Sequence, residues 1–203
     1  MVKPRPTCKA KVDVGFILDS SGRLRNNYQD EKYILKALVG AFGVSEDGSR
    51  AGVITFSYFS EHSIKLKDHT DINSFNKAVD DIPLMGSTTR IDRALRLTQR
   101  ELFKEENGGR PGVTKILILL TDGTQTQDVG AEDPGDITDE IRKTGVIVLV
   151  IGIGQGTNET ALNHMAGGPN KAFSAASFAE LVGGGFIDMV TKKSCEAGKN
   201  PPF

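Results

Sequence analysis

A chain of 203 residues is long enough for one domain with a sizeable hydrophobic core. Its 25 basic and 26 acidic residues nearly cancel, and no segment is a basic block, which argues against nucleic acid as a partner. The longest apolar runs, 116–120 and 146–153, are well short of the roughly 20 residues that a membrane-spanning helix needs. We therefore expect a globular domain with no membrane span.

The first predicted element is a buried strand that ends in a polar turn. Residues 14–18 form a nearly continuous apolar run, which is typical of a central parallel strand buried on both faces. The run ends at Asp19 and is followed by a Ser-Ser-Gly turn that contains Ser21. Ligands of open α/β sheets bind at the carboxyl ends of the strands. Asp19 and Ser21 are therefore candidate site residues.

The next segments predict a helix and two paired strands. Apolar residues with helical spacing place a helix over about 27–43, namely Leu35, Leu38, Val39 and Phe42. The run 51–56 reads as a second buried strand, and the alternating segment 62–67 as an edge strand with one wet face. The connection between these strands is short and has no helix, so we expect them to pair antiparallel.

A capped helix and a polar loop follow. Asp71 is placed to cap a helix that Pro83 stops, with an apolar face of Phe75, Ala78, Val79 and Ile82. The polar loop 85–89 then brings Thr89 to the start of a third helix, whose apolar face holds Ile91, Ala94, Leu95, Thr98 and Leu102.

The second half of the chain alternates between strand and helix patterns. Strands are predicted over 113–120, 146–153 and 171–173, and helices over 136–144, around Leu162 and from 178 to 190. Ser177 and Glu180 form a capping box for the last helix. This alternation predicts an α/β fold with a doubly wound, mostly parallel sheet.

Three polar loops converge on one edge of that sheet. The first strand delivers Asp19 and Ser21, the fourth ends at Asp122, and the loop before the third helix supplies Thr89. Two carboxylates and two hydroxyls form an all-oxygen set that suits a hard cation such as Mg²⁺ or Mn²⁺. The alternative is that the two aspartates only cap turns, as this residue type often does.

Three motifs make the chain similar to a von Willebrand factor A domain: Asp19-Ser20-Ser21, the segment Gly-Ser-Thr-Thr-Arg-Ile-Asp-Arg-Ala-Leu at 86–95, and Leu-Leu-Thr-Asp-Gly at 119–123. The resemblance runs over 11–193 and is strongest to the extracellular-matrix branch, as in matrilins and collagen-associated modules. It leaves an N-terminal flank, 1–10, and a C-terminal flank, 194–203.

The resemblance implies a sheet in the order 3-2-1-4-5-6 with one antiparallel edge strand. It implies a secreted adhesion module of the extracellular matrix and not an enzyme, one unit of a larger protein that binds a matrix or cell-surface protein. Many such domains hold Mg²⁺ or Mn²⁺ in a metal-ion-dependent adhesion site (MIDAS), where a carboxylate of the partner completes the coordination. Asp19, Ser21, Thr89 and Asp122 match its ligand positions.

Arg23 departs from the family pattern, which has a serine there. An arginine has no lone pair to offer a metal and carries a fixed positive charge. Either it points into solvent and water fills the vacant ligand position, or it folds back onto Asp19 or Asp122 as an internal cation. In both cases we expect weaker metal binding than at an intact site, and Arg23 is a candidate ligand-binding residue.

Only two cysteines are present, Cys8 and Cys195, and they flank the predicted domain. Domain termini often lie close together, so a disulfide is expected, which implies an oxidising compartment; two unrelated free thiols are the alternative. The pair also resembles the matrix branch of the family. Asn158 begins an Asn-Glu-Thr glycosylation sequon, which agrees with secretion.

Two other functions are alternatives to an adhesion module. One is a metal-independent structural matrix domain. The other is a Mg²⁺-dependent phosphohydrolase with Asp19 as nucleophile, but that chemistry would want a second aspartate where Ser21 stands. His62, His69 and His164 are scattered without metal-ligand spacing and read as surface or hydrogen-bonded residues. Asp128, Glu132 and Asp133 read as a solvated rim beside the site.

Overall fold

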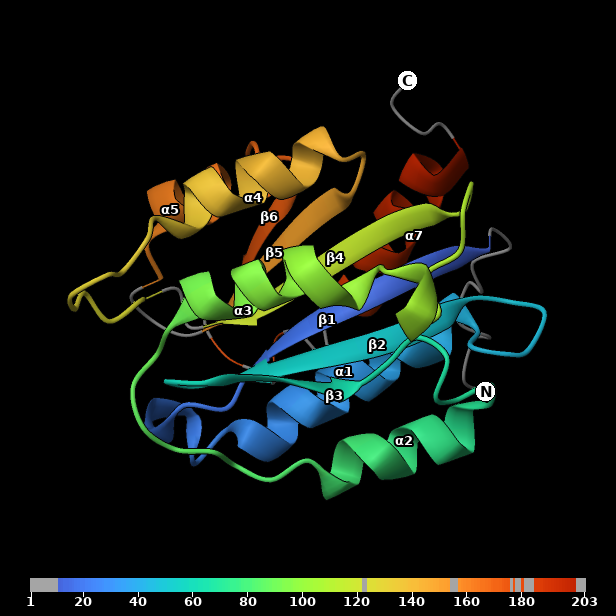
Figure 1. Cartoon of the computed structure of the whole chain (residues 1–203), viewed down its shortest axis with the longest axis horizontal. Helices are drawn as coiled ribbons and strands as arrows, with labels where there is room; N and C mark the ends of the chain where they lie inside the picture. Colours follow the sequence, from blue (N-terminus) through green and yellow to red (C-terminus); the bar gives the residue numbers. More distant parts are fainter. Residues whose placement is uncertain are drawn as a thin grey trace.

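The computed structural model describes residues 11–199 except 122–123, 154–156, 176, 178–179 and 181–184, with only the backbone given at 186, 193–195 and 197–199. Within these residues six strands form one sheet in the order β3-β2-β1-β4-β5-β6 (Figure 1). Their bounds are β1 Val12–Asp19, β2 Arg50–Phe56, β3 Ser60–Ile64, β4 Thr114–Thr121, β5 Ile147–Ile153 and β6 Ala172–Ala175. The predicted strand order is confirmed.

β1 lies in the middle of the sheet and pairs in parallel with both β2 and β4. β4 pairs with β5, and β5 with β6, also in parallel. β3 pairs antiparallel with β2, as the short connection predicted, with a register shift between Val53 and Ile54. The carboxyl ends of β1, β2, β4 and β5 consequently meet at one edge of the sheet.

Helices cover both faces of the sheet (Figure 1). One face packs against α1 (Tyr28–Phe42), α2 (Ile72–Asp81) and α7 (Phe186–Lys199), and the other against α3 (Ile91–Leu97), α4 (Pro134–Lys143) and α5 (Glu159–Ala166). A short 3-10 helix, Gly22–Leu24, follows β1, and a π-helical turn, Thr98–Leu102, extends α3. No described helix has the length and apolar composition to cross a bilayer.

The two faces of β1 carry different side chains. Val14, Phe16 and Leu18 belong to the hydrophobic cluster under α1, α2 and α7. On the opposite face Gly15 leaves room for Leu102, because a Cβ at position 15 would lie 2.2 Å from Leu102 Cδ2. The missing side chain therefore lets the π-helical turn lie directly on the sheet.

Several predicted boundaries are confirmed and others are wrong. The Asp71 carboxylate accepts hydrogen bonds from the amides of Asn73 and Ser74 and begins α2 as expected. The edge strand ends at Ile64 instead of 67, because Asp68 closes a turn by accepting the Lys65 amide at 2.8 Å. α4 begins at Pro134, earlier than predicted, because Asp133 caps it.

The last helix is not continuous from 178 to 190. Gly185 adopts φ +71°, a left-handed conformation that interrupts a helix, and α7 begins immediately after it. Half of the predicted capping box is present, since the Glu180 amide donates to Ser177 Oγ at 3.4 Å. α7 continues past residue 193 to Lys199.

Candidate functional site

The turn after β1 is fixed by its own carboxylate. Asp19 Oδ1 accepts the Ser21 amide at 2.8 Å, and the Ser20 amide donates to the Phe56 carbonyl at 2.7 Å. Asp19, Ser20 and Ser21 are all fully buried. Asp19 and Ser21 therefore lie where the sequence predicted, at the carboxyl end of the central strand.

A second loop, 83–89, is hydrogen-bonded to this turn. The Gly22 amide donates to the Ser87 carbonyl at 3.0 Å, and the Gly86 amide donates to the Ser20 carbonyl at 2.9 Å. The Ser20 hydroxyl accepts the Met85 amide at 2.7 Å. Gly86 and Ser87 both have positive φ, +71° and +72°, and for Ser87 this is a strained conformation of the kind that gathers at functional sites.

Pro83 joins both loops to helix α1. The hydroxyl of Ser20 donates to the Pro83 carbonyl at 3.2 Å, and the phenol of Tyr28 donates to the same oxygen at 3.1 Å. Burial raises the pKa of Tyr28 to about 12, which keeps the phenol a neutral donor at physiological pH. Three elements therefore meet at one carbonyl oxygen.

Thr89 connects the loop to the third segment of the site. It is fully buried. Its amide donates to Thr126 Oγ1 at 3.3 Å, and its carbonyl accepts the Thr126 amide at 2.8 Å. The loop after β4 is therefore tied to the start of α3, and the segments that carry Asp19, Ser21 and Thr89 form one hydrogen-bonded unit.

The hydroxyls of Ser21 and Thr89 are buried and have no hydrogen-bond partner among the described residues. Buried hydroxyls in proteins are nearly always hydrogen-bonded, so two such oxygens on joined loops require an explanation. Together with the Asp19 carboxylate they make a donor set that fits a hard cation. Asp122, the fourth predicted ligand, lies outside the described residues.

Arg23 is exposed and lies in the 3-10 turn that directly follows Ser21. Its predicted influence on the cation stays a prediction. Asn158 is exposed at the N-cap of α5, where its Oδ1 accepts the Ala161 amide at 3.2 Å, and its glycosylation is likewise a prediction. Cys8 and the side chain of Cys195 lie outside the described residues, and the disulfide between them stays a prediction.

Sequence analysis missed a buried arginine next to the site. Arg90, 2% exposed, donates to both carboxylate oxygens of Asp92, to Asp128 at 2.6 Å and to the Gly130 carbonyl at 3.0 Å. Burial alone would raise the pKa of Asp92, but the hydrogen bonds from Arg90 and the Glu132 amide lower it. Asp128 therefore pairs with Arg90, although Asp128, Glu132 and Asp133 are all exposed, as expected for a solvated rim.

Gln125 and Glu132 complete the link between α3 and the loop after β4. The Asp92 amide donates to Gln125 Oε1 at 2.8 Å, and Gln125 Nε2 donates to the Glu132 carbonyl at 2.8 Å. The Glu132 amide in turn donates to Asp92 Oδ2 at 3.2 Å. The loop beside Thr89 is thus held in place over most of its length. The sequence does contain an Arg-x-Asp pair and, further along, an acidic loop. Their spacing alone does not distinguish a buried ion pair from charges on the surface.

Comparisons with known proteins agree with this architecture. Residues 13–184 match the model of the von Willebrand factor type A domain. The collagen alpha-6(VI) chain of Mus musculus is 32% identical over 169 residues, which cover 83% of this chain and 7% of that protein. Von Willebrand factor A domain-containing protein 2 of Xenopus laevis is 28% identical over 196 residues, 96% of this chain and 24% of that protein.

A solved structure is also similar. Proximal thread matrix protein 1 from the mussel byssus superposes with a TM-score of 0.85 at 28% identity, over 93% of this chain and 49% of that one. Another structure of the same mussel protein is described as having a zinc-occupied MIDAS motif. The chain thus spans less than half of each of these proteins.

The relatives agree with the expectation of a secreted component of the extracellular matrix that serves as an interaction module. The strand order, the joined loops at the carboxyl ends of the strands and the match over most of the chain lead to one conclusion. The chain belongs to the von Willebrand factor type A domain family.

Proposed function

We propose that the loops at the carboxyl ends of β1 and β4 bind a carboxylate-bearing side chain of a matrix or cell-surface protein, such as a collagen-like protein, through the positive charge of Arg23 and of a weakly held divalent cation. Asp19, Ser21, Thr89 and Asp122 would hold the cation, Mg²⁺ or Mn²⁺. When bound, it supplies a positive centre that attracts the partner's carboxylate. The function is adhesion and not catalysis.

The observation that carries this proposal is the pair of buried hydroxyls without hydrogen-bond partners among the described residues, Ser21 Oγ and Thr89 Oγ1. Leaving a buried hydroxyl without a partner costs about 1–3 kcal/mol. A cation would accept a lone pair from both oxygens. The backbone hydrogen bonds between the loops keep the hydroxyls in place before any cation arrives, which lowers the ordering cost of binding.

We also propose that Arg23 weakens this cation site. It stands where the family pattern has a ligand serine, and its fixed charge adds repulsion. Arg23→Ser removes that charge and adds an oxygen ligand. Titration calorimetry with Mg²⁺ should therefore show tighter binding to Arg23→Ser than to the parent chain.

A matched pair of threonine variants tests the ligand set. Thr98 also has a buried hydroxyl without a partner among the described residues, but it lies at the far end of α3. Thr89→Val and Thr98→Val therefore remove the same group in two places. We expect Mg²⁺ binding, measured in the Arg23→Ser background, to disappear only with Thr89→Val. Equal Mg²⁺ affinity in both variants would contradict the assignment.

A further inference from the structure

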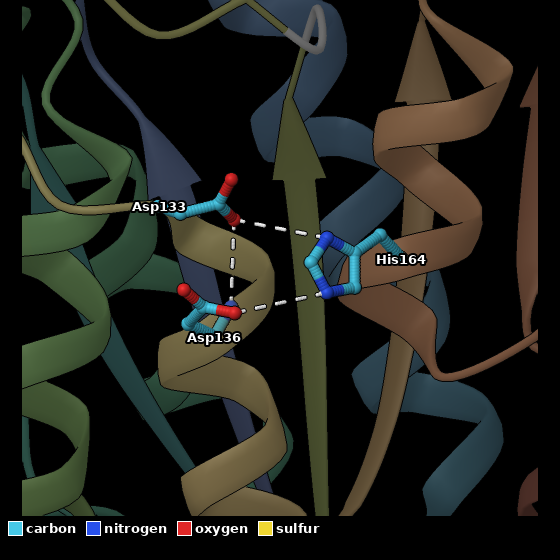
Figure 2. A group of neighbouring side chains, drawn as sticks. All are labelled: Asp133, Asp136 and His164. Carbon is cyan, nitrogen blue, oxygen red and sulfur yellow. Dashed lines mark hydrogen bonds and ion pairs between the residues drawn. The ribbon is translucent and has the colours of Figure 1, made fainter.

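A histidine and two aspartates face one another where the loop after β4 enters α4. His164 on α5 has its Nδ1 3.7 Å from Oδ1 of Asp133, the N-cap residue of α4, and its Nε2 4.0 Å from Oδ1 of Asp136 in the first turn of α4 (Figure 2). One ligand atom from each of the three residues lies within 4.8 Å of the others. The sequence pattern does not predict this group, because His164 is 28 residues from Asp136 and only the packing of α5 on α4 brings them together.

The imidazole is held against α4 by a glycine. A Cβ built at Gly135 would lie 2.2 Å from His164 Nδ1, so no other residue type would let the ring approach this closely. Gly135 sits in the first turn of α4, between Asp133 and Asp136. The glycine thereby lets the imidazole ring lie beside the two carboxylates before any ion binds.

We propose that Asp133, Asp136 and His164 form a second cation site, selective for a borderline transition ion of the Zn²⁺ class. Imidazole nitrogen with carboxylate oxygen is a ligand set that suits zinc and nickel better than magnesium. Zinc–ligand bonds of about 2.0–2.2 Å place tetrahedral ligand atoms about 3.4 Å apart, so the exposed Asp136 side chain must turn from Nε2, which it faces at 4.0 Å, toward Nδ1. The remaining position stays open to water or to a partner's side chain.

Nδ1 faces Asp133 at 3.7 Å, whereas Nε2 faces both Asp136 and Asp139 at 4.0 Å, and we assign the ion to Nδ1 because it has the nearest carboxylate oxygen. A metal-bound histidine usually donates its other ring N–H to a carboxylate, which fixes the ring. On the Nε2 side, Asp139 Oδ2 lies 4.0 Å away, and Asp139 is itself paired with Arg142. Arg142 also donates to the carbonyl of His164 at 3.3 Å. Asp139 would have to move closer by about 1 Å to accept a hydrogen bond from Nε2–H, since such bonds are about 2.7–3.2 Å long.

Asp133 keeps a free oxygen for the ion. Its Oδ1 caps α4 by accepting the amides of Gly135 at 2.7 Å and Asp136 at 3.4 Å. Its Oδ2 accepts no hydrogen bond from a described residue. The group also borders a cleft of 640 Å³ lined by Thr124, Gln125, Asn158 and Met165, which gives an ion a path to the site.

The test is a Zn²⁺ titration of the whole chain in excess Mg²⁺, followed by nitrogen-15 NMR of the imidazoles. The chain has three histidines, so each ring is resolved separately. We expect a saturable shift of the Nδ1 signal of His164 with one equivalent of Zn²⁺, and no such shift for His62 or His69. Ser21→Ala should keep the shift, because Ser21 is not one of the proposed zinc ligands and none of these is among Asp19, Ser21, Thr89 and Asp122. Zinc binding that leaves the His164 signals in place would overturn the proposal.

Zinc affinities of matched aspartate variants give a second test, in which a folding defect can be distinguished from the loss of a ligand. Asp136→Asn removes a ligand while keeping the side-chain shape, and we expect zinc affinity to fall by at least about tenfold. Asp81→Asn removes an exposed carboxylate from α2 on the opposite face and should change nothing. Zinc should raise the melting temperature of the parent chain and of Asp81→Asn, but not of His164→Gln. Equal zinc affinity in Asp136→Asn and Asp81→Asn would also rule the site out.

Discussion

Arg90 holds the carboxylate of Asp92 by two hydrogen bonds, Nε to Oδ1 at 2.8 Å and Nη2 to Oδ2 at 2.6 Å. Both side chains are nearly completely buried, with 2% and 3% of their surface exposed. Arg90 directly follows Thr89 in the chain, and the pair anchors the loop after β4. Because both charges are desolvated, the pair should be costly to break but a weak source of net stability.

Arg90→Ala should destabilise the domain by about 3–5 kcal/mol, because it leaves the Asp92 charge buried without its main partner. Urea unfolding followed by circular dichroism measures this free energy. Arg100→Ala removes an exposed arginine near the end of α3 and should change stability by no more than about 0.5 kcal/mol. The double variant Arg90→Met, Asp92→Asn should lose less unfolding free energy than the sum of the losses in Arg90→Met and Asp92→Asn, because the two residues form one unit. Additive losses would show that they act separately.

The same pair makes stability depend on pH in the acid range. The pKa of Asp92 is lowered in the folded protein, so its stabilising contribution is fully present above the unfolded value of about 3.9. It is lost as pH falls through the lower, folded value. The difference in unfolding free energy between the parent chain and Asp92→Asn should therefore be constant from about pH 5 to 8 and shrink below about pH 4. A difference that grows on acidification would reverse the assigned direction.

The elements that the sequence predicted well are those set by local patterns. The strands at 14–18 and 51–56 carry continuous apolar runs, and Asp71 begins α2 by a local hydrogen bond. The antiparallel edge followed from a short connection. Asp19, Ser21 and Thr89 could be grouped because parallel strands end at one edge of a sheet.

The features that sequence analysis missed depend on contacts between distant segments. Arg90 reaches Asp128 across 38 residues, and Arg110 binds the buried Asp13 carboxylate across 97. The 107–112 segment that contains Arg110 reads only as a turn. Gly185 interrupts the last helix through its backbone conformation, although the apolar spacing continues past it. Periodicity reports which face of an element is buried, and it carries no information about the partner of a buried charge.

Two glycines should respond to alanine in opposite directions. Gly15→Ala places a methyl group 2.2 Å from Leu102 Cδ2 and should cost about 1–3 kcal/mol of stability, because the packed side chain must move. Gly40 lies in α1 with nothing within 4 Å of an added Cβ. Gly40→Ala should therefore stabilise the domain by about 0.5–1 kcal/mol, since alanine favours the helix. Thermal unfolding of both variants measures the contrast, and adding Leu102→Ala to Gly15→Ala should reduce the loss. A Gly15→Ala variant as stable as the parent would show that the π-helical turn is not fixed on β1.

Arg23 offers a test of how the adhesion face attracts its partner. A guanidinium can bind a carboxylate through two charge-assisted hydrogen bonds, so it can supply part of the attraction that a cation supplies in related domains. Arg25 is a second exposed arginine two residues further along the chain and serves as the matched control. We expect Arg23→Ala to weaken adhesion to an acidic partner by about 2–5 kcal/mol, and Arg25→Ala to have little effect.

Surface plasmon resonance measures the affinity of the parent chain and of each variant for immobilised extracellular-matrix extract, with and without a chelator. If Arg23 carries much of the attraction, a chelator should change binding by the parent chain only slightly, because the guanidinium charge does not depend on metal. Binding by Arg23→Ser should instead be sensitive to the chelator. The serine adds an oxygen ligand that strengthens the cation site, and the guanidinium charge is no longer present to attract the partner. If instead a chelator abolishes binding by the parent chain while Arg23→Ala binds normally, the cation alone attracts the partner and Arg23 is a bystander.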